Sequence, residues 1–444
     1  MDEHELRRAA AWVNTVKPKD LPSPSVDSAR RIFLDDVGAM IAGHLDSEVQ
    51  DVLQDWPLMP GGSTVMRPGG GSAHPWSAAE VNALAGCWLE EDGGFRINTA
   101  HAGLYTLPTV IALAEDLGLT LGEAITAMVV GYEVAARIVT RWDVAAANSH
   151  AHGSVSAAAA AAAAGRALGL DEAQWMAAVT SAVTMSPAAP FGHAFAGAVV
   201  RNLWAAVGNR TGQVAVHAAR YGVGGLPTSI DDTYGDVFGS PRWQGAELSD
   251  ELGTAVQYAY QKMYGCCGYL HSAVEAVLNL QREEEFSSDD VVEITARMHK
   301  SGMPLNDVHP PTTLGARFSA PHAIAATLVR GAATPTSFNA DSLTDPKIRR
   351  LRERVEMVDI DRPDRDPALR DAEVELSLSD GRRLQRYVDI AIGDPARPMT
   401  EEQVVEKAAA LTGRDVRGLA ELLLEADLDT PFSEVSTLIR ELIS

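Results

Sequence analysis

A lysine, two adjacent thiols, three tyrosines and a histidine fall within the stretch Tyr260-Gln261-Lys262-Met263-Tyr264-Gly265-Cys266-Cys267-Gly268-Tyr269-Leu270-His271. An apolar run with helical spacing follows directly, from Ala273 to Leu280. Loops that precede helices often carry binding and catalytic side chains, and lysine and histidine both transfer protons in enzymes. We therefore predict that this stretch is a loop that presents acid–base groups at the mouth of a helix.

The size and charge of the chain limit its function. Its 444 residues suggest two domains, or one large domain with an insertion. The hydrophobic content of 46% is ample for a sizeable core. A net charge of −23 argues against a nucleic-acid partner, because phosphates would be repelled by such a surface. A small anionic substrate stays compatible, since a local site can invert the overall sign.

The cysteines and the N-terminus predict a cytoplasmic protein. Cys87, Cys266 and Cys267 are too few for a disulfide framework, and reduced thiols fit the cytosol. The acidic residues 1–5 lack the apolar core of a signal peptide. The alanine run 157–164 is too short to cross a bilayer, so we expect no membrane partner and predict a central buried helix there.

Residues 1–265 have mostly helical patterns. Small Ala and Gly side chains recur along these segments, which favours helices that pack closely in a dense bundle. Thr120 is expected to cap one of the helices. The expected helices begin at Ser25 or Asp27 and end at Gly43, and then cover 76–90, 107–117, 120–138, 154–167, 171–185 and 199–221.

The pattern changes after about residue 285. Residues 291–296, 355–360 and 372–378 are β-rich or alternate, and an Asp380-Gly381 turn leads to 382–388 as a hairpin. A capping box at Thr400 then opens a helical tail. We predict a mainly α fold: a large all-helical domain (1–267, completed by 398–444), interrupted by a smaller α+β lid domain (268–397).

The opening stretch resembles the Lys-x-Tyr-Pro-Cys-Cys-x-x-x-His signature of the MmgE/PrpD family, with Gly265 in place of the proline. Residues 131–137 resemble its Gly-Tyr-Glu-Val-x-x-Arg motif, and residues 393–400 its Gly-x-Pro-x-x-Pro-Met-Thr motif. The family includes 2-methylcitrate dehydratase, cis-aconitate decarboxylase and an iminodisuccinate epimerase. The resemblance covers nearly the whole chain and implies the same domain layout, a cofactor-independent lyase or isomerase, and a homodimer.

Several positions depart from the family pattern. The family's Asp-x-Asp-Asp cluster aligns Glu91 with its first aspartate, so that only Glu91 and Asp92 keep carboxylates. A family threonine falls on Phe95, whose side chain cannot form a hydrogen bond. Arg201 replaces a lysine; it cannot act as a base but can bind a carboxylate bidentately. These departures predict a divergent member with a changed binding pocket.

The resemblance identifies further candidates for acid–base chemistry. His101 and His150 fall on family histidine positions, and His322 falls on a family tyrosine in a segment that starts Ala316-Arg317. Lys262 is retained, and we predict that burial near other cations lowers its pKa so that it acts as a base. With Lys262, the predicted catalytic residues are His101, His150 and His322.

The predicted substrate-binding residues are Arg201, Glu91, Asp92, His152, Cys267 and His271. Purely structural roles stay open for some of these residues: His101 and His271 can be capping or packed side chains, and Arg201 can be a helix-surface residue. A His150–His152 zinc pair and a Cys266 or Cys267 nucleophile are also conceivable, but no third zinc ligand at a familiar spacing and no triad accompany them.

Together, these residues predict removal of a proton next to a carboxylate of a small di- or tricarboxylate, followed by dehydration, decarboxylation or epimerisation. No phosphate-binding loop, Rossmann fingerprint or metal-ligand cluster is present, so we expect no cofactor. The rival interpretations are a carboxylate-binding protein that kept the fold and lost the chemistry, and a zinc hydrolase.

Overall fold

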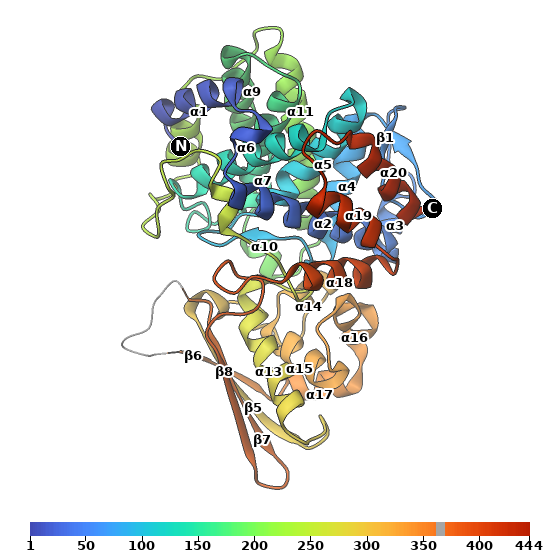
Figure 1. The fold of residues 1–444 in the computed structure, drawn as a ribbon. Coiled ribbons are helices and arrows are strands. Elements are labelled where there is room, and N and C mark those ends of the chain that lie inside the picture. The colour runs from blue at the N-terminus through green and yellow to red at the C-terminus, as the bar shows by residue number, and fades with distance from the viewer. Residues whose placement is uncertain (361–368) are drawn as a thin grey trace.

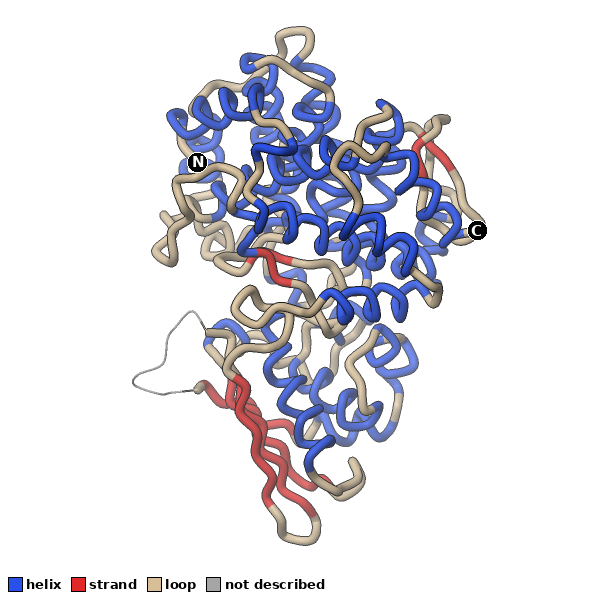
Figure 2. The backbone as a smooth tube through the Cα atoms, in the orientation of Figure 1, coloured by secondary structure: helices blue, strands red, loops and turns tan. Residues whose placement is uncertain are grey.

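The computed structural model describes residues 1–360 and 369–444, which form a larger helical body and a smaller mixed one (Figure 1). Apart from two short β pairings, the larger body is helical, whereas the smaller body carries a four-stranded sheet flanked by helices (Figure 2). The predicted fold class, a helical domain with a smaller α+β domain, is confirmed.

The larger body contains most helices of the chain. Thr120 caps its helix as predicted, in a capping box with Glu123, and Thr400 forms the predicted capping box with Gln403. The bounds are α1 Glu3–Thr15, α2 Ser23–Leu45, α3 Ser47–Leu53, α4 Pro75–Trp88, α5 Ala102–Leu117, α6 Leu121–Val139, α7 Ala151–Ser154, α8 Ser156–Ala167, α9 Glu172–Thr184, α10 Gly192–Phe195, α11 Arg201–Ala219, α12 Ser229–Asp231, α18 Glu401–Thr412, α19 Arg417–Glu425 and α20 Phe432–Ile443.

Close packing around α8 fixes the frame of this body. The alanines at 157–164 are fully buried, as predicted, and α5, α6, α9 and α11 surround the helix. Gly212 of α11 faces α8 so closely that an added Cβ would lie 2.6 Å from the Cβ of Ala160. Only small residues allow backbones to approach in this way. The helices that carry the site are therefore held rigidly at their ends.

The smaller body has a sheet with strand order β6-β5-β7-β8. β5 pairs with β6 in parallel and with β7 antiparallel, and β7 and β8 form the predicted hairpin. Helix α13 packs on β7 and β8, and α15 packs against α13 (Figure 1). The bounds are α13 His271–Glu283, β5 Val291–Met298, α14 Thr313–Arg317, α15 Ala320–Arg330, α16 Ala340–Thr344, α17 Pro346–Arg352, β6 Val355–Asp359, β7 Ala372–Leu378 and β8 Arg383–Val388.

The apolar cores follow the same division. One cluster of buried side chains runs up to Val256 and resumes at Met399, whereas the second lies mainly between Tyr264 and Val388. Helix α18 packs on α2, so the end of the chain returns to the first body. Within the described ranges, no helix is long and apolar enough to span a bilayer.

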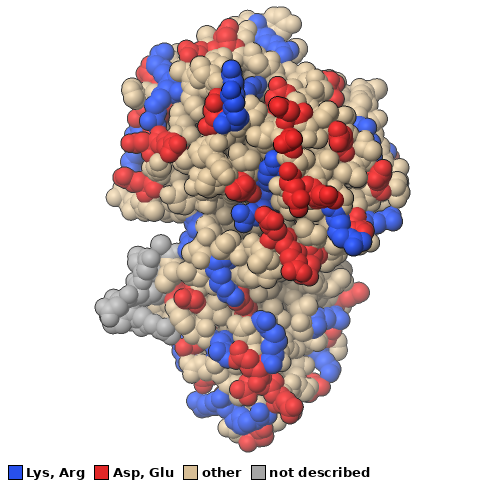
Figure 3. Space-filling model, in the orientation of Figure 1, with Lys and Arg blue, Asp and Glu red and all other residues tan. Residues whose placement is uncertain are grey.

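Charged side chains of both signs are interspersed on the face shown in Figure 3, despite the net charge of −23. The charges that matter for chemistry are therefore those buried between the two bodies.

Candidate active site

A short antiparallel pairing brings two distant segments together. β3 (Gly94–Phe95) pairs with β4 (Ala259–Tyr260), with Gly94 opposite Tyr260. A Cβ on Gly94 would lie 2.5 Å from the ring of Tyr260, which explains the glycine there. The pairing places the loop that follows β4, including Lys262, beside the turn that follows α4. The opening stretch of the sequence is thus a loop before a helix, as predicted.

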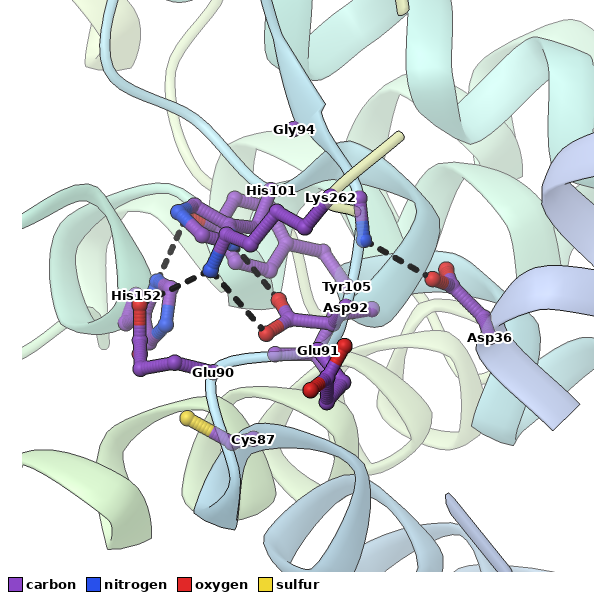
Figure 4. Close-up of polar contacts among 12 residues, drawn as sticks. Asp36, Cys87, Glu90, Glu91, Asp92, Gly94, His101, Tyr105, His152 and Lys262 are labelled. Carbon is purple, nitrogen blue, oxygen red and sulfur yellow. Dashed lines mark hydrogen bonds and ion pairs between the residues drawn. The ribbon is translucent and has the colours of Figure 1, made fainter. Parts of the chain in front are cut away.

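The turn after α4 directs its three carboxylates to opposite sides. Glu90 has a left-handed backbone (φ 57°), and Glu90 and Asp92 point toward Lys262 (Figure 4). Glu91 points the other way, toward Lys407 on α18, at 3.6 Å. The expectation that Glu91 binds substrate is wrong: it does not line the pocket, and Glu90 does.

Lys262 is a fully buried cation with two carboxylate partners. Its Nζ lies 2.8 Å from Oε2 of Glu90 and 3.7 Å from Oδ1 of Asp92. Burial alone would lower the pKa of Lys262, but the two carboxylates outweigh burial and raise it above its usual value. The expected neutral lysine base is therefore corrected. Lys262 is a fixed positive charge that lies behind the pocket wall.

His101 is held by a carboxylate as a general base usually is. Its Nδ1 lies 2.6 Å from Oδ2 of Asp92, at the start of α5. Burial lowers the pKa of His101 and Lys262 adds to this, although Asp92 opposes both. Nε2 has no hydrogen-bond partner among the described residues, and the side chain keeps 14% exposure. The neutral ring can therefore accept a proton from the pocket near pH 7.

Two more imidazoles stand beside His101. The ring of His152 is 4.6 Å from that of His101 and 4.4 Å from that of His150, and its Nδ1 is 2.9 Å from the hydroxyl of Tyr105. His150 lines the pocket and stacks on Phe191, whereas His152 lies behind it and is fully buried. Burial, followed by Arg201, lowers the pKa of both rings well below the usual value.

Arg201 reaches the pocket from the first residue of α11. Its Nη1 lies 2.5 Å from Oε1 of Glu90 and 2.8 Å from Sγ of Cys87. The side chain is 1% exposed, so Arg201 is not an exposed residue on the helix surface, which was the alternative to a role in binding. Glu90 therefore bridges two cations, Arg201 and Lys262.

The pocket between the bodies has a largely aromatic wall. Besides Thr99 and the tyrosine hydroxyls, its polar side chains are Glu90, His101, His150 and Arg201 from the larger body and Cys267 and Arg370 from the other segments. The aromatic side chains in the wall are Phe95, Tyr105, Phe191, Phe195, Tyr260, Tyr269 and Phe318.

Two candidates lie outside this pocket. His322 is buried within the smaller body, where Nε2 is 3.1 Å from Oγ of Ser342, so the structure does not bring it to the other acid–base groups. His271 lines a neighbouring hollow, and its Nε2 is 3.2 Å from the carbonyl oxygen of Cys266. Burial lowers the pKa of His271 to about 3, so it is neutral.

The zinc alternative meets an electrostatic obstacle. Within residues 1–360 and 369–444, metal-ligating atoms cluster as Cys87–Glu90–His152 and as Asp92–His101–His152, without His150. The oxygens of Glu90 and Asp92 already contact Lys262, and Glu90 also contacts Arg201. A metal ion there would face two fixed positive charges at close range. The donor set does not fit a zinc site that uses His150 and His152.

The cysteine alternative is also unfavourable. Burial raises the pKa of Cys266 well above its usual value and that of Cys267 to about 11, so both are thiols near neutral pH. Cys267 remains a pocket-lining candidate for contact with substrate.

Glu91 predicts a pH effect on stability. Burial raises its pKa from 4.5 to about 7, with Lys407 opposing. The folded state therefore holds a proton that the unfolded state loses, and stability falls as pH rises from 4.5 to 7. Glu91→Gln should raise the free energy of unfolding at pH 8 by up to about 3 kcal/mol and change it little at pH 4.5. Denaturant unfolding at both pH values measures this.

The matched control is Glu421→Gln on the exposed side of α19, which should leave the free energy of unfolding unchanged at both pH values. An equal gain for Glu91→Gln at pH 4.5 and pH 8 would contradict the account.

The helical body, the α+β body and the pocket of acid–base groups at their junction define a class of two-domain fold. The chain belongs to the MmgE/PrpD family: residues 7–239 match its N-terminal domain and residues 264–429 its C-terminal domain.

Curated relatives align over almost the full length. The chain is 24% identical to the cis-aconitate decarboxylase-like protein oryM of Aspergillus oryzae, over 96% of this chain and 95% of that one. It is 23% identical to a cis-aconitate decarboxylase of Aspergillus terreus, over 96% and 94% of the two chains.

Proposed function

We propose that the protein is a lyase or isomerase that transfers a proton at the carbon next to a carboxylate without a cofactor. The observation that carries the proposal is the 2.6 Å contact between Asp92 and Nδ1 of His101 at the wall of a buried pocket. A carboxylate that accepts the Nδ1 proton leaves the Nε2 lone pair available as a base. The names of the relatives, cis-aconitate decarboxylase and its like, support a carboxylate substrate.

Fixed charges around the pocket suit an enolate intermediate. When His101 removes the proton, the electron pair of the C–H bond moves onto the carboxylate and makes a dianionic enolate. Arg201 lines the pocket and can donate to that oxygen, and its contact with Glu90 fixes its orientation. Loss of a β-hydroxide as water, or return of the proton to the other face, completes elimination or epimerisation. Decarboxylation would instead require His101 to enter the step protonated: as CO2 leaves, the electron pair of the C–C bond moves onto a remaining carboxylate, and His101 then gives its proton to carbon.

Isotope exchange tests the proposal directly. The intact protein is incubated in D2O with a panel of mono-, di- and tricarboxylates, and deuterium incorporation next to the carboxylate and product formation are followed by NMR. We expect exchange or turnover with at least one compound, abolished by His101→Asn and kept by His322→Asn, since His322 lies outside the pocket. A panel with neither exchange nor turnover would refute the proposal.

The rival function is carboxylate binding without chemistry. It predicts that the panel compounds bind and that none exchanges. The buried His101–Asp92 pair favours catalysis, because a binding site needs no aligned base.

A homodimer stays a prediction from the family resemblance. Val200, Val207, Val214 and Tyr221 recur at seven-residue spacing along α11 and are 37–78% exposed, which suits contact with a second copy of the chain. The mass in solution, measured by light scattering, tests it.

A further inference from the structure

The pocket has an apolar side that the proton-transfer chemistry does not use. Phe191 and Phe195 meet edge to face with ring centroids 5.0 Å apart, and Phe195 lies 6.3 Å from Phe318. His150 extends this strip by stacking on Phe191 at 4.8 Å. All four side chains line the same pocket. A continuous aromatic strip favours an apolar or planar group, which packs against rings face to face or edge on.

The charges around the pocket nearly cancel. Two carboxylates, Glu90 and Asp92, are matched by two cations, Lys262 and Arg201, at 2.5–3.7 Å. The lowered pKa values of His101 and His150 keep both rings neutral near pH 7. Neighbouring Arg96 is paired with Asp394. The surplus of positive charge expected for a polycarboxylate site is therefore not found among the described residues.

Arg370 is a pocket cation that these ion pairs do not include. It lines the pocket and forms no ion pair with any carboxylate in the described part of the chain, while its guanidinium lies 5.2 Å from the ring of Tyr260 and 5.1 Å from that of Tyr269. One weak contact, at 3.5 Å, joins it to the carbonyl oxygen of Arg96. Contact with two rings helps to orient the planar guanidinium, whose remaining N–H groups can donate to a carboxylate.

We propose that the substrate of this site carries a single carboxylate, which binds Arg370, and an apolar or aromatic body that packs on the strip of Phe191, Phe195 and Phe318. This deepens the proposed function and rests on it only for the reaction. It also replaces the di- or tricarboxylate expected from the sequence, because among the described lining residues one cation, Arg370, has no ion-pair partner and can balance one negative charge. A second and third carboxylate would lie against the aromatic wall, where the other lining cation of the described residues, Arg201, is already paired with Glu90, so that their desolvation would be poorly compensated.

Binding of unreactive ligands to the intact protein tests the substrate class. The probes are phenylpropanoate, succinate and tricarballylate, measured by calorimetry at pH 7.5. We expect phenylpropanoate to bind at least about tenfold more tightly than tricarballylate. Tighter binding of tricarballylate or succinate would overturn the proposal, and so would the absence of phenylpropanoate binding.

Variants then test the two contacts. Arg370→Met should weaken phenylpropanoate binding at least about tenfold, with part of the loss recovered in Arg370→Lys. Arg383→Met, an exposed arginine of the same body, is the matched control and should bind as the unmodified protein does. Phe191→Ala should weaken phenylpropanoate more than propanoate. Unchanged binding in Arg370→Met overturns the proposal, and thermal unfolding of each variant shows that it is folded.

These measurements need no turnover, so the two proposals can fail separately. Exchange with a tricarboxylate alone would refute the substrate class and keep the proposed function. Binding of phenylpropanoate through Arg370, with no exchange or turnover of any panel compound, would refute the proposed function and keep the substrate class.

Discussion

Lys262→Met is expected to lower turnover strongly and to lower the free energy of unfolding by about 3–5 kcal/mol, because it leaves two buried carboxylates with one cation. Lys262 contacts Glu90 and Asp92 but not the pocket, so it acts by positioning them. Its charge also lowers the pKa of His101. The residual activity should therefore begin to fall at a higher pH, as the medium is acidified, than the activity of the unmodified protein does. pH–rate profiles measure this shift, and denaturant unfolding measures the loss of stability.

Lys407→Met provides the matched control. Lys407 is also a buried lysine, 2.8 Å from Oδ1 of Asp35 and 3.6 Å from Glu91, but it lies away from the pocket. Its replacement should destabilise the fold to a similar degree, while the folded fraction keeps its turnover number. If both variants lost turnover in proportion to stability alone, Lys262 would have only a structural role.

Asp92→Asn is expected to lower kcat by about 10²–10⁴-fold, the usual contribution of a positioned general base. The amide cannot hold the Nδ1 proton of His101 as a carboxylate does, so this proton moves to Nε2, the nitrogen that should accept the substrate proton. Loss of the negative charge lowers the pKa of His101 further. The acid limb of the pH–rate profile should thus move to lower pH, opposite to the shift expected for Lys262→Met.

Two comparisons make this result specific. Glu91→Gln alters a neighbouring carboxyl that faces away from the pocket, and it should keep near-normal kcat. The double variant Asp92→Asn/His101→Asn should lose little more than His101→Asn alone, because the two side chains act as one unit. Additive losses would show that Asp92 and His101 act independently.

Local patterns explain why most of the fold was predictable. Helical spacing, capping boxes at Thr120 and Thr400, and the Asp380-Gly381 turn each depend on residues within a few positions, and the structure agrees with them. Boundaries were less accurate. The helix expected from Leu107 begins at Ala102, directly after His101, and the one expected from Ser25 or Asp27 begins at Ser23.

The site was only partly predictable, for geometric reasons. The resemblance identified His101, His150, Arg201 and Lys262, which the structure brings together. It could not tell that the backbone at Glu90 is left-handed and turns Glu90, rather than Glu91, toward Lys262. The sign of the pKa shift of Lys262 depends on these distances and was missed for the same reason.

Arg370 was also missed, because nothing in its local sequence marks it as unpaired. Only the three-dimensional arrangement shows Tyr260 and Tyr269 around it, without an ion pair to any carboxylate of the described residues. The three tyrosines in the opening stretch were the available signal, since rings beside a loop of reactive groups are ready partners for a cation.

The contact of Lys407 with the carbonyl oxygen of Glu91, at 2.7 Å, joins residues 316 positions apart. During synthesis, the turn that carries Glu90 and Asp92 leaves the ribosome long before α18 does. The pocket floor therefore cannot be completed before α18 has been synthesised, and the acids that it will bury stay solvated until then. Such distant pairings slow folding, so this protein should acquire activity as a late step of its folding.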